Sequence, residues 1–242
     1  MRTLGEIIPV YKPKGVTSFE VVRILRRELS KVSPERKPEK IGHAGTLDPL
    51  AEGLLIVLTG NKTKLMNEFL KLDKEYLATF RLGATSKSHD LETELVEQTP
   101  HVSLSEEQVR DALKKYIGKI EQIPPEFSAT RINGKRAYKL ARRGVKFELK
   151  PKIVSITELD VEEFAAAHLK VRIVCSSGTY IRSLARDIGR DLGCGAVLEE
   201  LIRIRIGSYY AKNAAKLDEL NLSDGVSGKS GPSNNKHERV AA

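Results

Sequence analysis

The sequence predicts an α+β protein, because segments with strand periodicity and segments with helix periodicity occur along one chain of 242 residues. Residues 168–177 alternate apolar and polar side chains, as a half-buried strand does. Residues 105–117 and 180–192 repeat apolar side chains at helical spacing, which indicates amphipathic helices. A chain of this length can bury a sizeable core, as one large domain or as two small ones.

The first half of the chain contains three predicted strands and two predicted helices. The run LLIVLTG is continuously apolar and ends in glycine, which is typical of a buried strand. Val22, Leu25 and Leu29 share one face of the first helix. The predicted strands cover 6–12, 54–60 and 75–85, and the predicted helices cover 18–31 and 62–72.

The second half begins with the clearest helix, at 105–117. Ser105 and Gln108 have the spacing of a capping box, and Leu104 and Val109 that of a hydrophobic staple. Its predicted apolar face comprises Val109, Ala112, Leu113, Tyr116 and Ile117. Then come a charged insertion or long loop at 118–152, the strand at 168–177, the helix at 180–192 and a strand at 205–210.

Composition narrows the class of protein. The longest apolar runs are too short for a transmembrane helix or a signal peptide, so we expect a cytoplasmic protein. Cys175 and Cys194 are too few for a disulfide framework or a zinc site. The histidines show no metal-ligand spacing. We therefore expect chemistry without a metal.

Lys and Arg exceed Asp and Glu by nine, which favours a polyanionic partner. The basic residues cluster at 12–31, 131–152 and 203–207. The second cluster also contains Tyr138 and Phe147, a mixture that suits phosphate contact and base stacking. A solvated amphipathic helix and hairpin is the alternative interpretation of that cluster.

The segment GHAGTLDPLAEG, at 42–53, places a lone carboxylate, Asp48, in a glycine-punctuated loop. Asp-Pro is ordinary turn punctuation, but a loop aspartate is also a candidate nucleophile, general base or metal ligand. Only His43 and Glu52 stand nearby as further metal ligands. The sequence GNKT at 60–63 does not complete a nucleotide-phosphate loop.

A carboxylate nucleophile needs a cation that keeps it ionised. CSSGTYIR, at 175–182, ends a strand, turns at Gly178 and begins a helix at about Tyr180. Arg182 falls in the first turn, where a positive charge is unfavourable to the helix dipole. A surface arginine is the plain alternative, but Arg182 is the candidate partner of Asp48.

Five motifs, in this order and spacing, resemble the bacterial tRNA pseudouridine(55) synthase family over roughly residues 4–212. They are KPKGVTS (12–18), GHAGTLDPLAEGLL (from 42), KEYLATFRLG (74–83), CSSGTYIRSLARDIG (175–189) and LIRIRIG (201–207). The resemblance implies a pseudouridine synthase fold, with a mixed, mostly antiparallel sheet flanked by helices and loops. It also implies isomerisation of uridine 55 in the tRNA T-loop to pseudouridine, without cofactor or metal.

The resemblance also implies roles for individual residues. Asp48 matches the nucleophile, Arg182 the arginine that pairs with it, and Tyr76 the tyrosine that stacks on the target base and transfers a proton. His43 matches a histidine that displaces or stacks against T-loop bases. Lys12 matches a residue that buttresses the catalytic loop.

The remaining implied contacts concern the RNA. Leu201 matches a leucine that lines the uracil pocket, and residues 124–152 match a basic insertion that closes over the tRNA loop. Further candidate RNA contacts are Tyr180, Arg131, Lys135, Arg142 and Arg143. The catalytic domain is expected over 1–212, and 213–242 is expected to be a short remnant and a disordered tail rather than a full PUA-type RNA-binding domain.

The chemistry is consistent with these residue types. A uridine in folded RNA must leave its stack before its glycosidic bond can break, and aromatic stacking and phosphate contacts offset the cost. A carboxylate can attack either the uracil C6 or the sugar C1′, and the residues do not distinguish the two routes.

The sequence departs from the family pattern at Tyr11, where the family usually has Asp, in the loop TSKSHDLE (85–92), and in the inserted SPERKPEK (33–40). Two other functions remain open. A non-catalytic RNA-binding protein or tRNA folding chaperone would bind RNA without changing it, and a glycosidase-like hydrolase would release free uracil. We expect a monomer with tRNA as its partner and no obligate protein partner.

Overall fold

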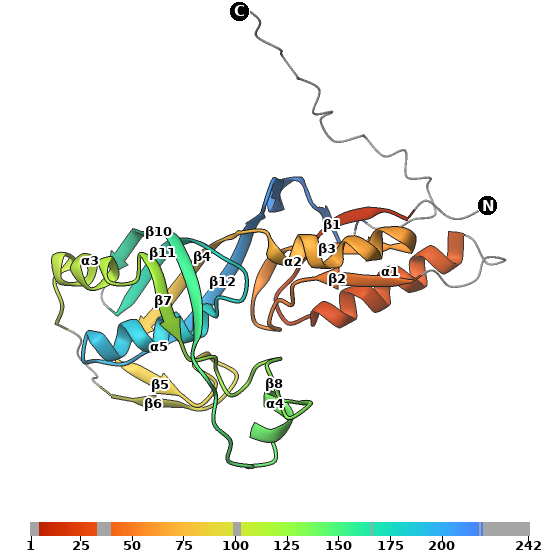
Figure 1. The fold of residues 1–242 in the computed structure, drawn as a ribbon. Coiled ribbons are helices and arrows are strands. Elements are labelled where there is room, and N and C mark those ends of the chain that lie inside the picture. The colour runs from red at the N-terminus through yellow and green to blue at the C-terminus, as the bar shows by residue number, and fades with distance from the viewer. Residues whose placement is uncertain (1–4, 33–39, 99–102, 166, 218, 220–242) are drawn as a thin grey trace, which may run out of the picture.

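The computed structural model describes residues 5–32, 40–98, 103–165, 167–217 and 219. Their main feature is a 10-stranded sheet (Figure 1). Its strands are β1 (Ile7–Lys12), β2 (Ile41–Ala44), β3 (Glu52–Thr59), β4 (Lys74–Leu82), β7 (Gly118–Gln122), β10 (Lys152–Ala165), β11 (His168–Cys175), β12 (Ala196–Ile206), β13 (Tyr209–Tyr210) and β14 (Ala215–Lys216).

The strand order along the sheet is β14-β1-β3-β12-β4-β11-β10-β7, with β2 beside β3 and β13 beside β12. The pairs β1–β14 and β3–β12 are parallel, and the other pairs are antiparallel. The predicted mixed, mostly antiparallel sheet is therefore confirmed.

The helices and two hairpins surround this sheet. The helices are α1 (Ser18–Val32), α2 (Met66–Lys71), α3 (Glu106–Lys114), α4 (Ala137–Ala141) and α5 (Ile181–Asp191), with 3-10 turns at Gly60–Leu65 and Ala211–Asn213. The hairpins are β5 (Ala84–Ser86) with β6 (Leu95–Glu97), and β8 (Arg131–Ile132) with β9 (Lys135–Arg136).

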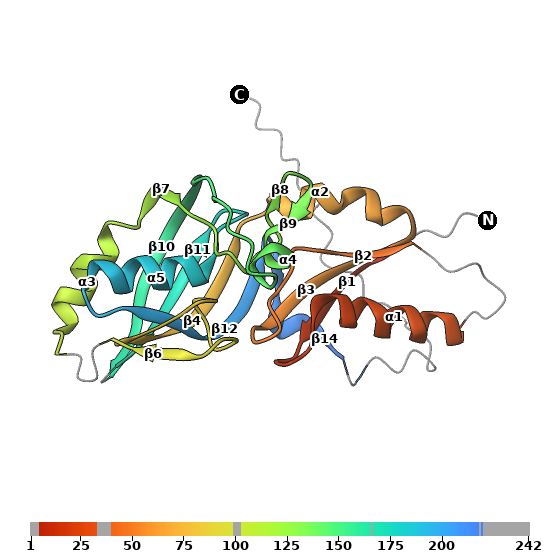
Figure 2. The ribbon, with the colours of Figure 1, turned by 90° about the horizontal axis from the view of Figure 1, so that it is seen from below.

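Strand β3 is buried on both faces, which explains its continuous apolar run. Leu55 and Val57 point to one face and pack with Leu25 of α1. Leu54 and Ile56, in the other phase of the strand, pack with residues of α2. The two helices accordingly lie on opposite sides of β3 (Figure 2).

A second core forms where α3 and α5 cover one face of β4, β10, β11 and β12. The alternating side chains of β11 that were predicted to point inward are all buried, as are Phe80 of β4 and Leu184 of α5. The other face of these strands carries ion pairs such as Arg172–Glu75, with 2.8 Å between Nη1 and Oε1. This part of the sheet is thus apolar on one side and polar on the other, as the alternation predicted.

Several sequence predictions need correction. Residues 118–122, predicted as insertion or loop, form the edge strand β7, which pairs with β10. The predicted strand at 205–210 is the end of the longer β12 plus a tight turn to β13. The helix predicted at 62–72 begins as a 3-10 turn. Ile117 is exposed, because α3 ends at Lys114 and helical spacing no longer applies beyond it.

Strand β10 and most of β12 were not predicted, because β-bulges interrupt their alternation. The register of β10 shifts between Ile156 and Glu158, and that of β12 between Leu198 and Glu200. Each bulge changes which residues point inward, so a period of two is not visible in the sequence. The predicted disordered tail lies almost entirely outside the described residues, although β14 continues the fold past residue 212.

The sheet has two parts: β14, β1, β3 and β2 form one, and β12, β13, β4, β11, β10 and β7 form the other. The two parts meet where β3 and β12 pair in parallel, at Ile202↔Glu52 and Arg203↔Gly53. Gly53 has φ +106°, and a Cβ there would lie 2.3 Å from the backbone oxygen of Arg203. Only glycine allows this backbone conformation and this close approach. The last glycine of the GHAGTLDPLAEG segment thus joins the two parts beside the Asp48 loop.

Gly53→Ala is expected to lower the free energy of unfolding by about 2–4 kcal/mol, from the left-handed conformation and from overpacking against β12. Gly118→Ala is a matched control, because Gly118 has φ +99° with open space around its Cβ position. The control should cost only about 1–2 kcal/mol, the conformational part. Urea unfolding measures both, and equal losses would show that the β3–β12 approach contributes nothing.

Candidate active site

The Asp48 loop connects β2 to β3 at the junction of the two parts of the sheet. Gly45, with φ +99°, turns the chain out of β2, and the backbone N–H of Ala51 bonds to the Asp48 carbonyl at 3.1 Å. The Asp48 side chain is 40% exposed. The loop therefore presents a carboxylate that a substrate can reach.

Three buried side chains hold this loop in place through hydrogen bonds to backbone groups. The Ser18 hydroxyl accepts from the Leu47 N–H at 2.8 Å and donates to the Leu47 carbonyl at 2.9 Å. Lys12 Nζ donates to the carbonyls of Val16 (2.7 Å), Pro13 (3.0 Å) and Pro49 (3.5 Å). Arg203 donates to the carbonyls of Leu54 (2.7 Å) and Gly45 (3.0 Å). The loop is thus held by groups with no access to water.

Lys12 is fully buried, and burial lowers its pKa to about 8, with Asp48 opposing that shift and Arg203 adding to it. This position suits the buttressing role expected for Lys12 and not a direct contact with RNA. Arg203 and Ser18 were not singled out from the sequence. In the pattern IRIRI, an arginine that points into the core looks the same as one that points to solvent.

Arg182 occupies the first turn of α5, and its side chain is 5% exposed. Its Nε lies 2.9 Å from Asp48 Oδ2 and 3.5 Å from Asp90 Oδ2. Its Nη1 donates to the Ser88 carbonyl at 3.1 Å and its Nη2 to the Phe127 carbonyl at 2.9 Å. These contacts satisfy a buried guanidinium that would otherwise be unfavourable at a helix N-terminus. The pairing that charge considerations suggested is present.

Asp90 was not singled out from the sequence, because nothing in the spacing connects it to an arginine 92 positions away. His89 before it has φ 60°, a left-handed conformation that is uncommon for a residue other than glycine. This turn lets the Ser88 carbonyl and the Asp90 carboxylate reach the same guanidinium. The His89 carbonyl accepts from the Leu198 N–H at 2.9 Å, which attaches the turn to β12.

Opposing effects act on the Asp48 carboxyl group. Burial has the largest effect and raises its pKa, the Arg182 guanidinium lowers it, and Asp90 and Glu92 raise it again. The net direction is upward, which indicates a more basic carboxylate than a solvated aspartate. A partly exposed carboxylate against a buried, fixed cation is a suitable arrangement for a nucleophile.

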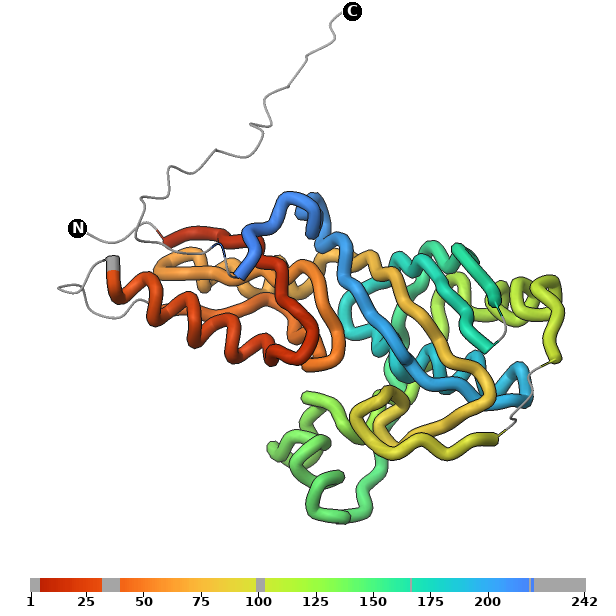
Figure 3. Tube along the Cα trace, turned by 180° about the vertical axis from the view of Figure 1, so that it is seen from behind, coloured from red at the N-terminus to blue at the C-terminus, as the bar shows by residue number. Residues whose placement is uncertain are grey.

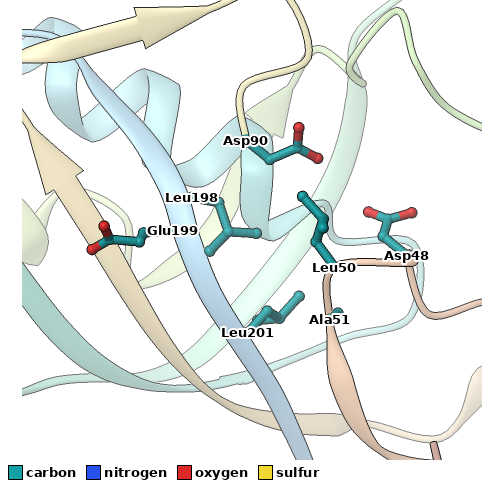
Figure 4. A pocket seen from close by; sticks show the side chains of 7 residues that line it. All are labelled: Asp48, Leu50, Ala51, Asp90, Leu198, Glu199 and Leu201. Atoms are coloured by element: carbon teal, nitrogen blue, oxygen red, sulfur yellow. The ribbon is translucent and has the colours of Figure 1, made fainter. Parts of the chain in front are cut away.

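A pocket opens beside this pair (Figure 4). Leu50 and Leu201 give it an apolar wall, and the carboxylates of Asp48 and Asp90 lie on one side of it. Glu199 points away from both aspartates, beyond the β12 backbone. The remaining lining residues are Ala51 and Leu198. The pocket therefore combines an apolar wall with two carboxylates.

Tyr76 and His43 lie close to the same cluster. Tyr76 of β4 is 8% exposed, and burial raises the pKa of its phenol while the Arg203 guanidinium opposes the shift. His43 of β2 has a buried Nδ1 without a hydrogen-bond partner among the residues that the structure describes. Burial and then Arg203 lower the pKa of His43. Both side chains are therefore neutral at neutral pH.

The other predicted RNA contacts lie on or beside the basic insertion at 124–152, which projects from the rest of the protein (Figure 1). The Tyr180 hydroxyl lies 3.1 Å from Thr130 Oγ1, which joins the insertion to the start of α5. Arg142 forms an ion pair with Glu92. Three further predicted residues are exposed, namely Arg131, Lys135 and Arg143.

The described ranges contain no group of three or more His, Cys, Asp or Glu side chains placed to hold a metal ion. Every helix in them is too short or too polar to cross a bilayer.

Comparison with known proteins identifies the class first. The chain resembles a solved chain in the crystal structure of a Cbf5-Nop10-Gar1 complex, with a TM-score of 0.66 and 29% identity over 89% of this chain. A chain in the structure of an H/ACA RNP bound to a substrate RNA containing 2'-deoxyuridine gives a TM-score of 0.64 at 27% identity. This chain spans about half the length of each, 53% and 52%. The fold is thus that of a pseudouridine synthase.

The family follows from the sequence relatives. The TruB family pseudouridylate synthase N-terminal domain matches residues 32–181, and the tRNA pseudouridylate synthase B C-terminal domain matches residues 182–224. The protein named tRNA pseudouridine synthase B from Bacteroides fragilis is 50% identical over 84% of this chain and 87% of its own length. Its namesake from Parabacteroides distasonis is 51% identical over 89% and 92%. The chain belongs to the TruB family of pseudouridylate synthases.

Lys12→Met is expected to lower the free energy of unfolding by about 1–3 kcal/mol, because buried carbonyls lose their donor. Lys14→Met is the matched control, since Lys14 is exposed two residues away, and it should change stability by less than about 0.5 kcal/mol. Chemical denaturation compares them. A Lys12→Met protein as stable as the control would contradict the role of Lys12 as a support of the loop.

Proposed function

We propose that the chain isomerises uridine 55 in the T-loop of tRNA to pseudouridine, with Asp48 as the nucleophile. The observation that carries this proposal is the Asp48–Arg182 pair beside an apolar pocket. Its carboxylate is 40% exposed, while its cation is 5% exposed and fixed by further contacts. The substrate can reach the Asp48 carboxylate, and backbone hydrogen bonds hold the Arg182 guanidinium beside that carboxylate.

The proposed reaction rearranges bonds within the nucleotide and neither adds nor removes an atom overall. The N1–C1′ bond breaks, a C5–C1′ bond forms, the proton on C5 leaves and N1 gains a proton. No electron is transferred to or from a cofactor. Asp48 can attack C1′ or C6, and either adduct returns the carboxylate when the new bond has formed.

The apolar wall has a specific task in this reaction. The detached uracil must rotate before it rejoins the sugar, and it must not escape. Leu201 and Leu50 can hold its faces without hydrogen bonds that would fix its orientation. Burial raises the pKa of the Tyr76 phenol, which stays protonated at neutral pH, so it can donate a proton rather than accept one.

The base must first leave the RNA stack, at a cost of a few kcal/mol. His43 of β2 is neutral and partly exposed, and its proposed role is to contact the displaced bases. Arg131, Lys135 and Arg143 offer exposed positive charge for the phosphates. We propose that the chain acts as a monomer in the cytoplasm, with tRNA as its partner.

Asp48→Asn is expected to lower turnover at least about 10³-fold, as removal of a nucleophile does. The test is an unmodified tRNA transcript incubated with each protein, followed by mapping of pseudouridine at single-nucleotide resolution. Asp111→Asn, an exposed change on α3, is the control and should retain activity. A transcript with cytidine at position 55 should give no product.

The folded Asp48→Asn protein should be at least as stable as the original. The pKa of Asp48 is raised on folding, so its ionisation opposes folding. This cost grows as the pH rises above the unfolded pKa and is complete above the folded pKa. Asparagine removes that cost, and Arg182 keeps Asp90 as a partner. An active variant would contradict the nucleophile role. Binding without product by the unchanged protein would indicate an RNA-binding protein, and free uracil would indicate a hydrolase.

A further inference from the structure

One ion pair connects the basic insertion to the loop that carries Asp90. Arg142, which follows α4, places Nη2 3.1 Å from Oε1 of Glu92. Its guanidinium also lies over the Tyr138 ring, 5.8 Å from the centroid. The insertion and the β5–β6 hairpin, whose connecting loop contains Glu92, are neighbouring projections when seen from behind (Figure 3).

Glu92 is attached directly to the charged cluster of the active site. Its backbone N–H donates to Asp90 Oδ1 at 2.9 Å, and the other carboxylate oxygen of Asp90 lies 3.5 Å from Arg182 Nε. Arg182 in turn donates to the Phe127 carbonyl at 2.9 Å, at the base of the insertion. The insertion thus meets the cluster at its base, through Phe127, and near its far end, through Arg142.

The Arg142–Glu92 pair is well placed to exchange partners. The side chains are 63% and 39% exposed, and exposed pairs of this kind stabilise a protein little. Carboxylate and phosphate are alternative partners for the same face of a guanidinium. An RNA that approaches the site brings phosphates close to Arg142 and gains further from counterion release.

We propose that Glu92 occupies, in the RNA-free protein, the place on Arg142 that a phosphate of the bound RNA takes. Glu92 is then a positioning residue: it holds the insertion beside the site before binding, and it must release Arg142 when RNA arrives. The proposal rests on the proposed function only for the identity of the RNA. Because Glu92 competes with the phosphate, its carboxylate weakens RNA binding.

The test compares Glu92→Gln with Glu97→Gln. Glu97 pairs with Arg81 at 2.7 Å on the same hairpin, so both variants remove one negative charge and one Arg–Glu pair, but only Glu92 meets the insertion. Fluorescence anisotropy with an unmodified tRNA transcript gives Kd, and initial rates give KM and kcat. Glu92→Gln should lower Kd and KM about two- to fivefold relative to Glu97→Gln.

A double-variant cycle assigns the effect to Arg142. Arg142→Gln should raise Kd and reduce the slope of log Kd against log salt by about one unit. In that background, Glu92→Gln should change Kd no more than Glu97→Gln does, because no guanidinium is left to release.

Three results would overturn the proposal. They are an increase in Kd for Glu92→Gln, a change equal to that for Glu97→Gln, and an undiminished effect when Arg142 is absent. The proposed function is tested separately by turnover of the unchanged protein. Binding measurements therefore decide the role of Glu92 even if no pseudouridine forms.

Discussion

The architecture of the site depends on one buried guanidinium. A charge that is 5% exposed is strongly unfavourable unless every donor finds an acceptor, so Arg182 requires partners wherever it points. It obtains them from Asp48 after β2, from Ser88 and Asp90 between β5 and β6, and from Phe127 after β7. Three segments far apart in the sequence thus converge on a single side chain. The position of the loop that carries Asp48 therefore depends on the same arginine that positions the other two segments.

Two further buried cations, Lys12 and Arg203, support the Asp48 loop by donating to backbone carbonyls rather than to carboxylates. The charge of Lys12 interacts with that of Asp48, and this attraction raises the pKa of Lys12 against the effect of its burial. This concentration of positive charge also suits a substrate with a phosphate backbone. Stability and chemistry consequently share the same residues, and Gly53, between the loop and Arg203, allows the two parts of the sheet to meet there.

The sequence predicts what depends on local pattern. α5 and β11 show clear periodicity, the capping box of Ser105 and Gln108 forms as expected, and the Asp48–Arg182 pair follows from the demand of a carboxylate nucleophile for a cation. β10 escapes prediction because bulges shift its inward-facing phase. Asp90 and Arg203 escape because their roles come from tertiary contacts: neither a polar loop nor an alternating strand indicates which charge is turned inward.

The central claim is that Arg182 lowers the pKa of Asp48 against the upward effect of its partial burial. The most direct test is a pH titration of the Asp48 carboxyl carbon by NMR in protein labelled at aspartate, assigned with Asp48→Asn and repeated in Arg182→Gln. The account predicts that the pKa of Asp48 lies above that of an ordinary aspartate and rises further when Arg182 is replaced, because burial and Asp90 then act without opposition. An unchanged or lower pKa of Asp48 in the Arg182→Gln protein would contradict it.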